Sequence, residues 1–123
     1  MKKQEFFIAA SLKCLGVSPS LLGYHYLKYG IELMMNDQSL INSITKTLYP
    51  TIAEHFNATT SSVERAIRHA IEVGWVRGDR KAQDDLFGYT VDVDKGKPTN
   101  CEFIATVADY LLMGEVNGGD ING

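Results

Sequence analysis

The strongest helical pattern in the chain is TTSSVERAIRHAIEVGW, residues 59–75. It opens with four hydroxyl residues. Serine and threonine are favoured at helix starts because their oxygens accept hydrogen bonds from the first backbone amides. At about 100° per residue the apolar residues fall on one continuous arc, which predicts an amphipathic helix. This arc consists of Val63, Ala66, Ile67, Ala70, Ile71, Val73 and Gly74. Its small alanines predict the close approach of a neighbouring helix.

The opposite arc of the same helix carries cations and hydroxyl groups. It consists of Ser61, Ser62, Glu64, Arg65, Arg68, His69 and Glu72. Arginine, histidine and hydroxyl groups near the start of a helix can hydrogen-bond phosphates and the edges of DNA bases. Taken alone, the stretch fits an ordinary solvated helix face equally well.

The chain has the size and composition of a single soluble domain. At 123 residues, with 45% hydrophobic and 22% charged residues, it can form one modest core. No apolar run approaches the roughly 20 residues that span a bilayer, so we expect no membrane association. The apolar N-terminal segment is short and is interrupted by Ser11 and Lys13, which favours a first helix over a signal peptide. We therefore expect a cytoplasmic protein.

Charge is distributed unevenly along the chain, whose formal net charge is -3. Residues 1–81 hold ten Lys and Arg against seven Asp and Glu, a balance of +3. Residues 82–123 hold two against eight, a balance of -6. A weakly basic face is compatible with this distribution, and local potential governs the approach of DNA more than net charge does. Because the basic excess is small, we expect phosphate-driven affinity to be modest and salt-sensitive.

Residues that would indicate a metal site or a catalytic centre are scattered. His25, His55 and His69 form no cluster at metal-ligand spacing, and the sequence has no phosphate-binding glycine loop or nucleophile motif. Cys14 and Cys101 lie in no paired pattern, and in a reducing compartment we expect both to be buried as small apolar residues. We predict a protein without metal, cofactor or enzymatic activity.

Helical periodicity and capping residues predict an all-α single domain of six helices. The expected helices cover residues 4–15, 19–35, 38–48, 50–56, 60–77 and 99–113. Ser18 followed by Pro19 predicts the start of the second helix, because serine caps and proline suits the first turn. Leu22 and Ile41 are assigned to buried sides by their spacing. Trp75 is expected to anchor the end of its helix in the core.

The C-terminal third changes character. Residues 78–98 are rich in charged residues and glycine and are expected to form an ordered loop. Thr99 and Glu102 have the spacing of a capping box, which predicts the start of the last helix. We divide the chain into a helix-turn-helix domain over residues 1–113 and a flexible tail over residues 114–123.

Residues 50–77 have the pattern of a helix-turn-helix, a short helix followed by a short turn and a longer helix. Arg65 and Arg68 lie three residues apart on the polar arc. Each can clamp a phosphate or pair with a guanine through two hydrogen bonds, which contributes about 1–3 kcal/mol of base discrimination. His69 can contact a phosphate or a base edge, and its protonation would add pH sensitivity.

Glu64 has two interpretations that the sequence leaves open. Its carboxylate can accept from a cytosine amine, or it can complete a capping box with Ser61. The candidate DNA-binding residues are Ser61, Ser62, Glu64, Arg65, Arg68 and His69.

The block VERAIRHAIEV, residues 63–73, resembles the recognition helix of the stage-zero sporulation regulator A family. Members of this family are response-regulator transcription factors. The resemblance covers about residues 8–112. Further matching segments are GY at 23–24 followed by YL at 26–27, SITK at 43–46, LYP at 48–50 followed by IA at 52–53, FGYTV at 87–91, and KPTN at 97–100 followed by EFIA at 102–105.

This resemblance implies an effector domain of about six helices that binds a short box in double-stranded DNA and regulates transcription. It also implies contact with a sigma factor of RNA polymerase and pairing of two copies on adjacent boxes. By motif match, Glu64, Arg65, Arg68 and His69 take the family's DNA-reading positions.

Two departures from the family pattern matter. The family carries arginine just before the Val-Glu-Arg run, where this chain has Ser62, so we expect one guanine-type contact to be lost. That loss weakens binding or changes the preferred box. The family's polypeptide also begins with a phosphoacceptor receiver domain and a linker. This chain is then a fragment of a longer regulator or a free-standing effector without phosphorylation control, and its Met1 start favours the second.

A rival hypothesis assumes the same fold but no DNA binding. Ser62 and the acidic C-terminal third are also compatible with a protein-interaction module that pairs with a related regulator or an RNA polymerase subunit. The polar arc of the 60–77 helix distinguishes the two hypotheses, because only the first requires Arg65 for binding. Target genes, and activation as against repression, do not follow from the sequence.

Overall fold

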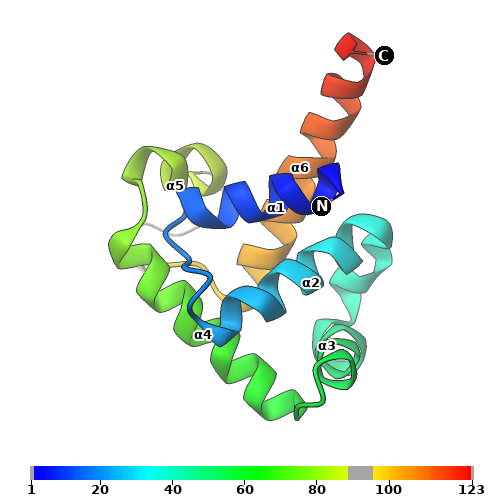
Figure 1. Ribbon diagram of the computed structural model, residues 1–123, viewed down its shortest axis with the longest axis vertical. Coiled ribbons are helices and arrows are strands. Elements are labelled where there is room, and N and C mark those ends of the chain that lie inside the picture. The colour runs from blue at the N-terminus through cyan, green and yellow to red at the C-terminus, as the bar shows by residue number, and fades with distance from the viewer. Residues whose placement is uncertain (1, 89–95, 123) are drawn as a thin grey trace.

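The computed structural model describes residues 2–88 and 96–122, with side chains described as far as residue 114. Within these parts the α-helices are α1 (Lys3–Cys14), α2 (Leu22–Asn36), α3 (Tyr49–His55), α4 (Thr60–Arg77), α5 (Arg80–Phe87) and α6 (Asn100–Asn122) (Figure 1). A 3₁₀ turn, η1 (Gln38–Asn42), and a π-helical turn, η2 (Ile44–Leu48), connect α2 to α3. The described residues contain no β-strand, and the predicted all-α class of six helices is confirmed.

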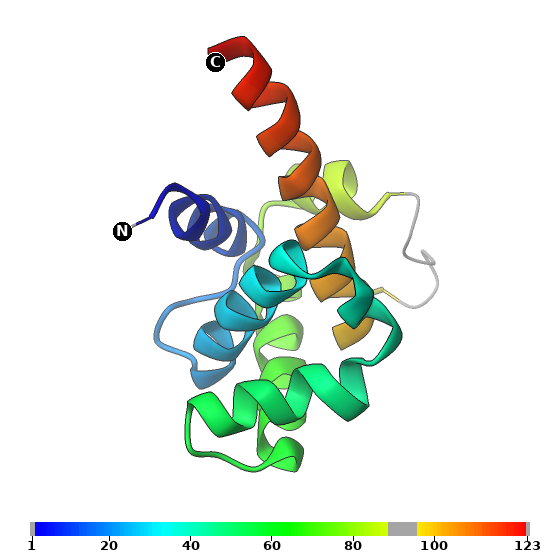
Figure 2. The ribbon, with the colours of Figure 1, turned by 90° about the vertical axis from the view of Figure 1, so that its right-hand side faces the viewer.

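α2 lies at the centre of the fold and packs against α1, α4 and α6 (Figures 1 and 2). Its residues Leu27 and Ile31 are fully buried. They share one core with Ile67 and Ile71 of α4 and with Ile104 of α6. Burying these side chains supplies the main driving force for docking the helices, since apolar burial stabilises by about 25 cal/mol per Å². The apolar side of α4 is thereby fixed inward and its polar side outward.

The closest approach between helices is that of α2 and α4 at Gly23. A Cβ atom at this position would lie 2.1 Å from the carbonyl oxygen of Ala66 and 2.7 Å from the Cβ of Ala70. No side chain fits in that space, so glycine and two alanines together set the distance between the two helices. This confirms the close helix contact predicted from the small residues of α4.

The start of α2 differs from the prediction. The helix begins at Leu22, not at Pro19, because residues 18–21 form a separate turn before the helix. The backbone amide of Leu21 donates to the Ser18 carbonyl at 3.1 Å, and the Ser20 amide donates to the Ser18 hydroxyl at 3.2 Å. Leu22 therefore stands in the first turn of the helix and is 58% exposed, so its assignment to the buried side was wrong.

The single helix expected over residues 38–48 is replaced by η1 and η2. Ser43 interrupts it with an extended φ of -147°, which changes the phase of the following turn. Ile41 is consequently exposed, against the prediction, whereas Ile44 and Leu48 are buried. Asp37 caps η1, since its carboxylate accepts from the backbone amide of Ser39 at 3.1 Å.

A helix that the sequence did not predict, α5, lies within the expected 78–98 loop. Asp79 caps it by accepting from the Lys81 amide at 3.0 Å. Phe87 is buried at its end and packs edge-on against Trp75 and face to face with Phe103. The core role predicted for Trp75 is thus confirmed. Residues 89–95 of the expected loop lie outside the described residues.

The start of α6 follows the prediction, whereas its end does not. The Thr99 amide donates to the Glu102 carboxylate at 2.8 Å, and the Glu102 amide donates to the Thr99 hydroxyl at 3.1 Å, which is a capping box. The helix continues past Met113 to Asn122, and its last turns project beyond the other helices (Figures 1 and 2). The division into a domain over 1–113 and a flexible tail over 114–123 stays a prediction.

Both cysteines are exposed free thiols, so the prediction that they are buried was wrong. Cys14 is the last residue of α1, where Leu12 and Leu15 take the core positions. Cys101 lies in the first turn of α6, where Phe103 takes the core position. None of the helices in the described ranges is long and apolar enough to cross a membrane.

Candidate nucleic-acid interface

The predicted helix-turn-helix segment forms two helices, α3 and α4, separated by residues 56–59. Asn57 turns the chain with a φ of 55°, a left-handed conformation that asparagine tolerates better than most residues. The amide of Ala58 then donates to the carbonyl of Ala53 at 2.8 Å and closes the turn. A tight turn therefore forms here without glycine.

The start of α4 is fixed by Thr59 and Ser62. The Ser62 amide donates to the Thr59 hydroxyl at 3.1 Å, and the Thr59 amide donates to the Ser62 hydroxyl at 3.2 Å. These reciprocal bonds form the capping box of the helix, so a box made by Ser61 and Glu64 is excluded. Sequence analysis missed this pair because four consecutive hydroxyl residues offer several equivalent capping registers.

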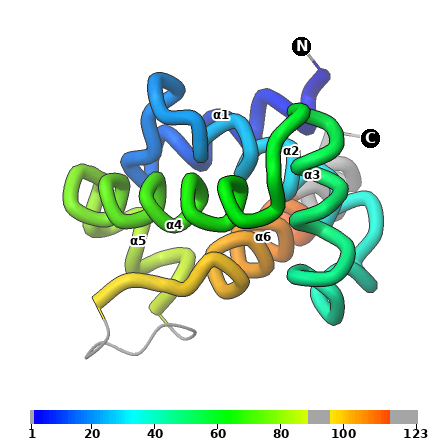
Figure 3. The backbone as a smooth tube through the Cα atoms, turned by 90° about the horizontal axis from the view of Figure 1, so that it is seen from below, coloured from blue at the N-terminus to red at the C-terminus, as the bar shows by residue number. Residues whose placement is uncertain are grey.

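The residues predicted to bind DNA all lie on the solvent side of α4. Val63, Ile67, Ala70, Ile71 and Gly74 are buried on the other side, as the helical period predicts. Ser61, Arg65, Arg68 and His69 are exposed, whereas Ser62 and Glu64 are half-buried. In Figure 3, α4 runs across the molecule with α3 beside its start and the beginning of α6 alongside. The exposed side chains thus stand on a rigid helix anchored by the core.

The two arginines of this face have different surroundings. Arg68 forms an ion pair with Glu64, one turn earlier on the same helix, and both side chains are partly exposed. The Glu64 carboxylate is thus engaged by Arg68. This is neither the contact with a cytosine nor the capping box with Ser61 that the sequence left open. Arg65 has no ion-pair partner within the described part of the chain. Its guanidinium is therefore available to a ligand.

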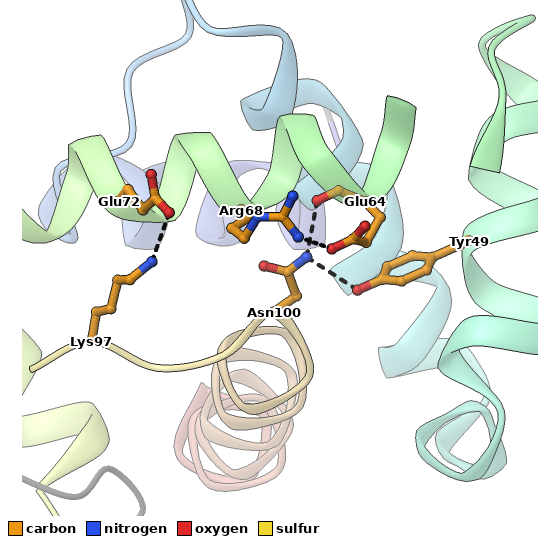
Figure 4. Close-up of polar contacts among 6 residues, drawn as sticks. All are labelled: Tyr49, Glu64, Arg68, Glu72, Lys97 and Asn100. Atoms are coloured by element: carbon orange, nitrogen blue, oxygen red, sulfur yellow. Dashed lines mark hydrogen bonds and ion pairs between the residues drawn. The ribbon is translucent and has the colours of Figure 1, made fainter. Parts of the chain in front are cut away.

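Asn100, at the start of α6, connects three helices at the edge of this face (Figure 4). Its side-chain amide donates to the backbone carbonyl of Glu64 at 3.1 Å and to the hydroxyl of Tyr49 at 3.2 Å. Burial raises the pKa of Tyr49 above its ordinary value, although the bond from Asn100 opposes this. Sequence analysis identified Asn100 only as part of a matching segment and did not predict this contact.

A second ion pair joins the segment before α6 to the middle of α4 (Figure 4). The Lys97 ammonium lies 2.8 Å from the carboxylate of Glu72. The hydrogen bond from Lys97, together with its charge, holds the pKa of Glu72 below its ordinary value. Sequence analysis placed Glu72 on the polar arc but gave no indication of its partner, which is 25 residues away.

A cleft of about 790 Å³ lies along α4 beside the start of α6, next to the contacts that Asn100 and Lys97 make with α4. Thr60, Ser61, Glu64 and Arg68 line it on the α4 side, and residues 97–101 line it on the other. Hydroxyl groups and two cations therefore border the same side of α4 that carries the predicted DNA-binding residues. In the residues that the structure describes, no three His, Cys, Asp or Glu side chains are grouped as a metal site would require.

Comparison with known families identifies this arrangement. Residues 8–111 match the family model described as sporulation initiation factor Spo0A C terminal, nearly the same range over which the sequence resembles the sporulation regulators. This family comprises DNA-binding effector domains of response regulators. The chain therefore belongs to the family of the Spo0A C-terminal domain, and it is a DNA-binding effector domain that regulates transcription in sporulation.

Proposed function

We propose that this protein reads a short DNA box by placing the first half of α4 in the major groove. The observation that carries the proposal is the position of Arg65, exposed on a core-anchored helix and without an ion-pair partner among the described residues. A helix-turn-helix protein contacts base edges with residues near the start of its second helix. Arg65 occupies such a position, since α4 begins at Thr60.

The other polar residues of α4 have distinct roles in this proposal. Arg65 forks onto a guanine, and Ser61, at the exposed start of the helix, donates to a backbone phosphate. Arg68 contacts a second base or a phosphate, and Glu64 holds its guanidinium in position until DNA arrives. His69, one residue further along the exposed side, contacts the DNA backbone. The arginine contacts are charge-assisted and are therefore shorter and stronger than neutral hydrogen bonds.

Ser62 has a different role from the arginine that the related sequences carry at this position. Its hydroxyl is committed to the capping box with Thr59, and it is half-buried. We therefore propose that Ser62 supports the helix start and does not read a base. The protein then lacks one base contact of the family, and its preferred box is bound more weakly or differs at one position.

The proposed partners follow from the family to which the chain belongs. They are double-stranded DNA, a second copy of the domain on an adjacent box, and a sigma factor of RNA polymerase. The rival proposal is a protein-interaction module that pairs with a related regulator or a polymerase subunit without binding DNA. It is favoured by the two carboxylates of α4, Glu64 and Glu72, which neutralise nearby cations.

An anisotropy titration with Arg65→Ala tests the proposal. The wild type and the variant are titrated with a duplex carrying the family's box and with a scrambled duplex, each at two salt concentrations. We expect Arg65→Ala to lose the preference for the box, at a cost of about 1–3 kcal/mol, while its thermal unfolding stays unchanged. The box preference separates base reading from phosphate attraction, because only the latter is independent of sequence.

Arg77→Ala is the matched control, because Arg77 is an exposed arginine in the last turn of the same helix. It removes the same charge at the far end of α4, and we expect it to preserve the box preference. A wild-type protein that does not distinguish the box from the scrambled duplex, even at low salt, would overturn the proposal in favour of the interaction module.

A further inference from the structure

We propose that Lys97 contacts a DNA phosphate, so that residues 96–99 form a second wall of the DNA interface beside α4. This inference rests on the proposed function, because it assumes that α4 faces DNA. The inference adds the Lys97 cation to the proposed DNA interface, although Lys97 lies outside the helix-turn-helix segment.

The position of Glu72 brings Lys97 to the DNA-facing side. Glu72 follows Arg65 by seven residues, which is close to two helical turns, so both side chains point to the same side of α4. The rise of a helix separates them by about 10 Å along the axis. Because the Lys97 ammonium lies 2.8 Å from the Glu72 carboxylate, it stands on the same side of α4 as Arg65, further along the helix axis.

The ammonium group of Lys97 retains capacity for a second acceptor. It has three N–H donors, and the hydrogen bond to Glu72 uses one of them. Its side chain is 39% exposed, so a phosphate oxygen has access without displacement of the segment. Glu72 then orients Lys97 toward the DNA, in addition to competing with the phosphate for the Lys97 ammonium.

The outer margin of the cleft between α4 and the start of α6 is the place for a sugar-phosphate strand, because the Asn100–Glu64 and Lys97–Glu72 contacts bridge the two elements. Lys97 and Arg68 border it from opposite sides, and the hydroxyl groups of Thr60 and Ser61 lie at the same margin. A helix in the major groove is flanked by the backbone strands of the duplex, which run past its two sides. One of these strands passes the side of α4 on which the cleft opens.

The salt dependence of binding tests this contact, because its slope counts the phosphates that the protein neutralises. We expect Lys97→Met to lower the slope by about 0.9 for the box and the scrambled duplex alike. Between 50 and 200 mM salt, the affinity advantage of the wild type over this variant shrinks about 3.5-fold. Lys97→Arg keeps the charge and is expected to keep the slope.

Lys3→Met is the matched control. It removes the same charge from the start of α1, which α2 separates from α4 (Figure 1), so we expect the wild-type slope. A purely structural role of Lys97 would weaken binding without changing the slope, and equal slopes for Lys97→Met and Lys3→Met would overturn the proposal. Loss of box preference in the wild type would instead overturn base reading by α4, and no binding at low salt would overturn both.

Discussion

The side-chain amide of Asn100 donates a hydrogen bond to the backbone carbonyl of Glu64 across 3.1 Å, which joins the first turn of α6 to the second turn of α4. The same amide also donates to the hydroxyl of Tyr49 in the first turn of α3. One half-buried side chain thereby links α3 and α4 to the start of α6. The direction in which α4 presents Arg65 depends on this link as well as on apolar packing.

Asn100→Ala is expected to lower the free energy of unfolding by about 1–3 kcal/mol, because it leaves a partly buried carbonyl and a partly buried hydroxyl without their shared donor. Chemical denaturation measures this change. We also expect weaker binding to the DNA box with an unchanged salt slope, since no phosphate contact is removed.

The control for this variant is Asn42→Ala. Asn42 is exposed at the end of η1 and has no side-chain hydrogen bond to another described residue. Its removal is expected to change the free energy of unfolding by less than about 0.5 kcal/mol. If both variants unfold at the same denaturant concentration, the two bonds of Asn100 contribute nothing measurable to stability.

Gly23→Ala is expected to destabilise the protein by forcing α2 and α4 apart. The added methyl group would meet the Ala66 carbonyl oxygen at 2.1 Å, and this backbone atom can move only with its helix. Overpacking of this kind costs about 1–3 kcal/mol or more. Thermal unfolding measures the loss.

Gly114→Ala makes the same chemical change in an open position of α6. A Cβ atom there has no neighbour within 4 Å. Because alanine has less conformational freedom to lose than glycine, we expect a stabilisation of about 0.5–1 kcal/mol at this helical position. A Gly23→Ala variant as stable as the wild type would show that the helices separate without cost.

Periodicity was sufficient to predict α4, because its buried and polar arcs alternate over five turns with little interruption. It failed at α5, where a single buried aromatic residue, Phe87, and a buried Gln83 replace the usual apolar stripe. Gln83 is tolerated because its amide donates to the Trp75 carbonyl at 3.2 Å. The buried side of α5 is defined by contacts with distant residues, such as the stacking of Phe87 on Phe103, and a local sequence pattern does not contain such contacts.

The candidate site, like the fold, was predictable only in part. The exposed arginines follow from the helical period, whereas the partners of Glu64 and Glu72 do not. Asn100 and Lys97 lie 36 and 25 residues from the groups that they contact. Such contacts depend on how α6 crosses α4, which is decided by the packing of the whole core.

Ser62→Arg is expected to change stability and DNA affinity in opposite directions. The substitution removes the hydroxyl that bonds to the Thr59 amide, at a cost of about 0.5–1.5 kcal/mol in unfolding free energy. It also supplies the arginine that the family resemblance predicts here, which is expected to tighten box binding by up to about 1–3 kcal/mol.

Ser62→Ala separates these two effects, because it removes the cap without adding an arginine. We expect it to unfold as easily as Ser62→Arg and to bind DNA no better than the wild type. Identical box affinities for the wild type and Ser62→Arg would show that position 62 does not reach the bases.

The ion pair between Lys97 and Glu72 predicts a specific pH dependence. The hydrogen bond and charge of Lys97 lower the pKa of Glu72 in the folded protein. A carboxyl group with a lowered folded pKa contributes stability above its unfolded pKa and loses that contribution as the pH falls through the folded value. Lys97→Met removes the cause, so the Glu72 pKa is expected to rise toward its ordinary value. An NMR titration of the Glu72 carboxyl carbon in both proteins measures this shift, and an unchanged pKa in the variant would mean that the pair does not persist in solution.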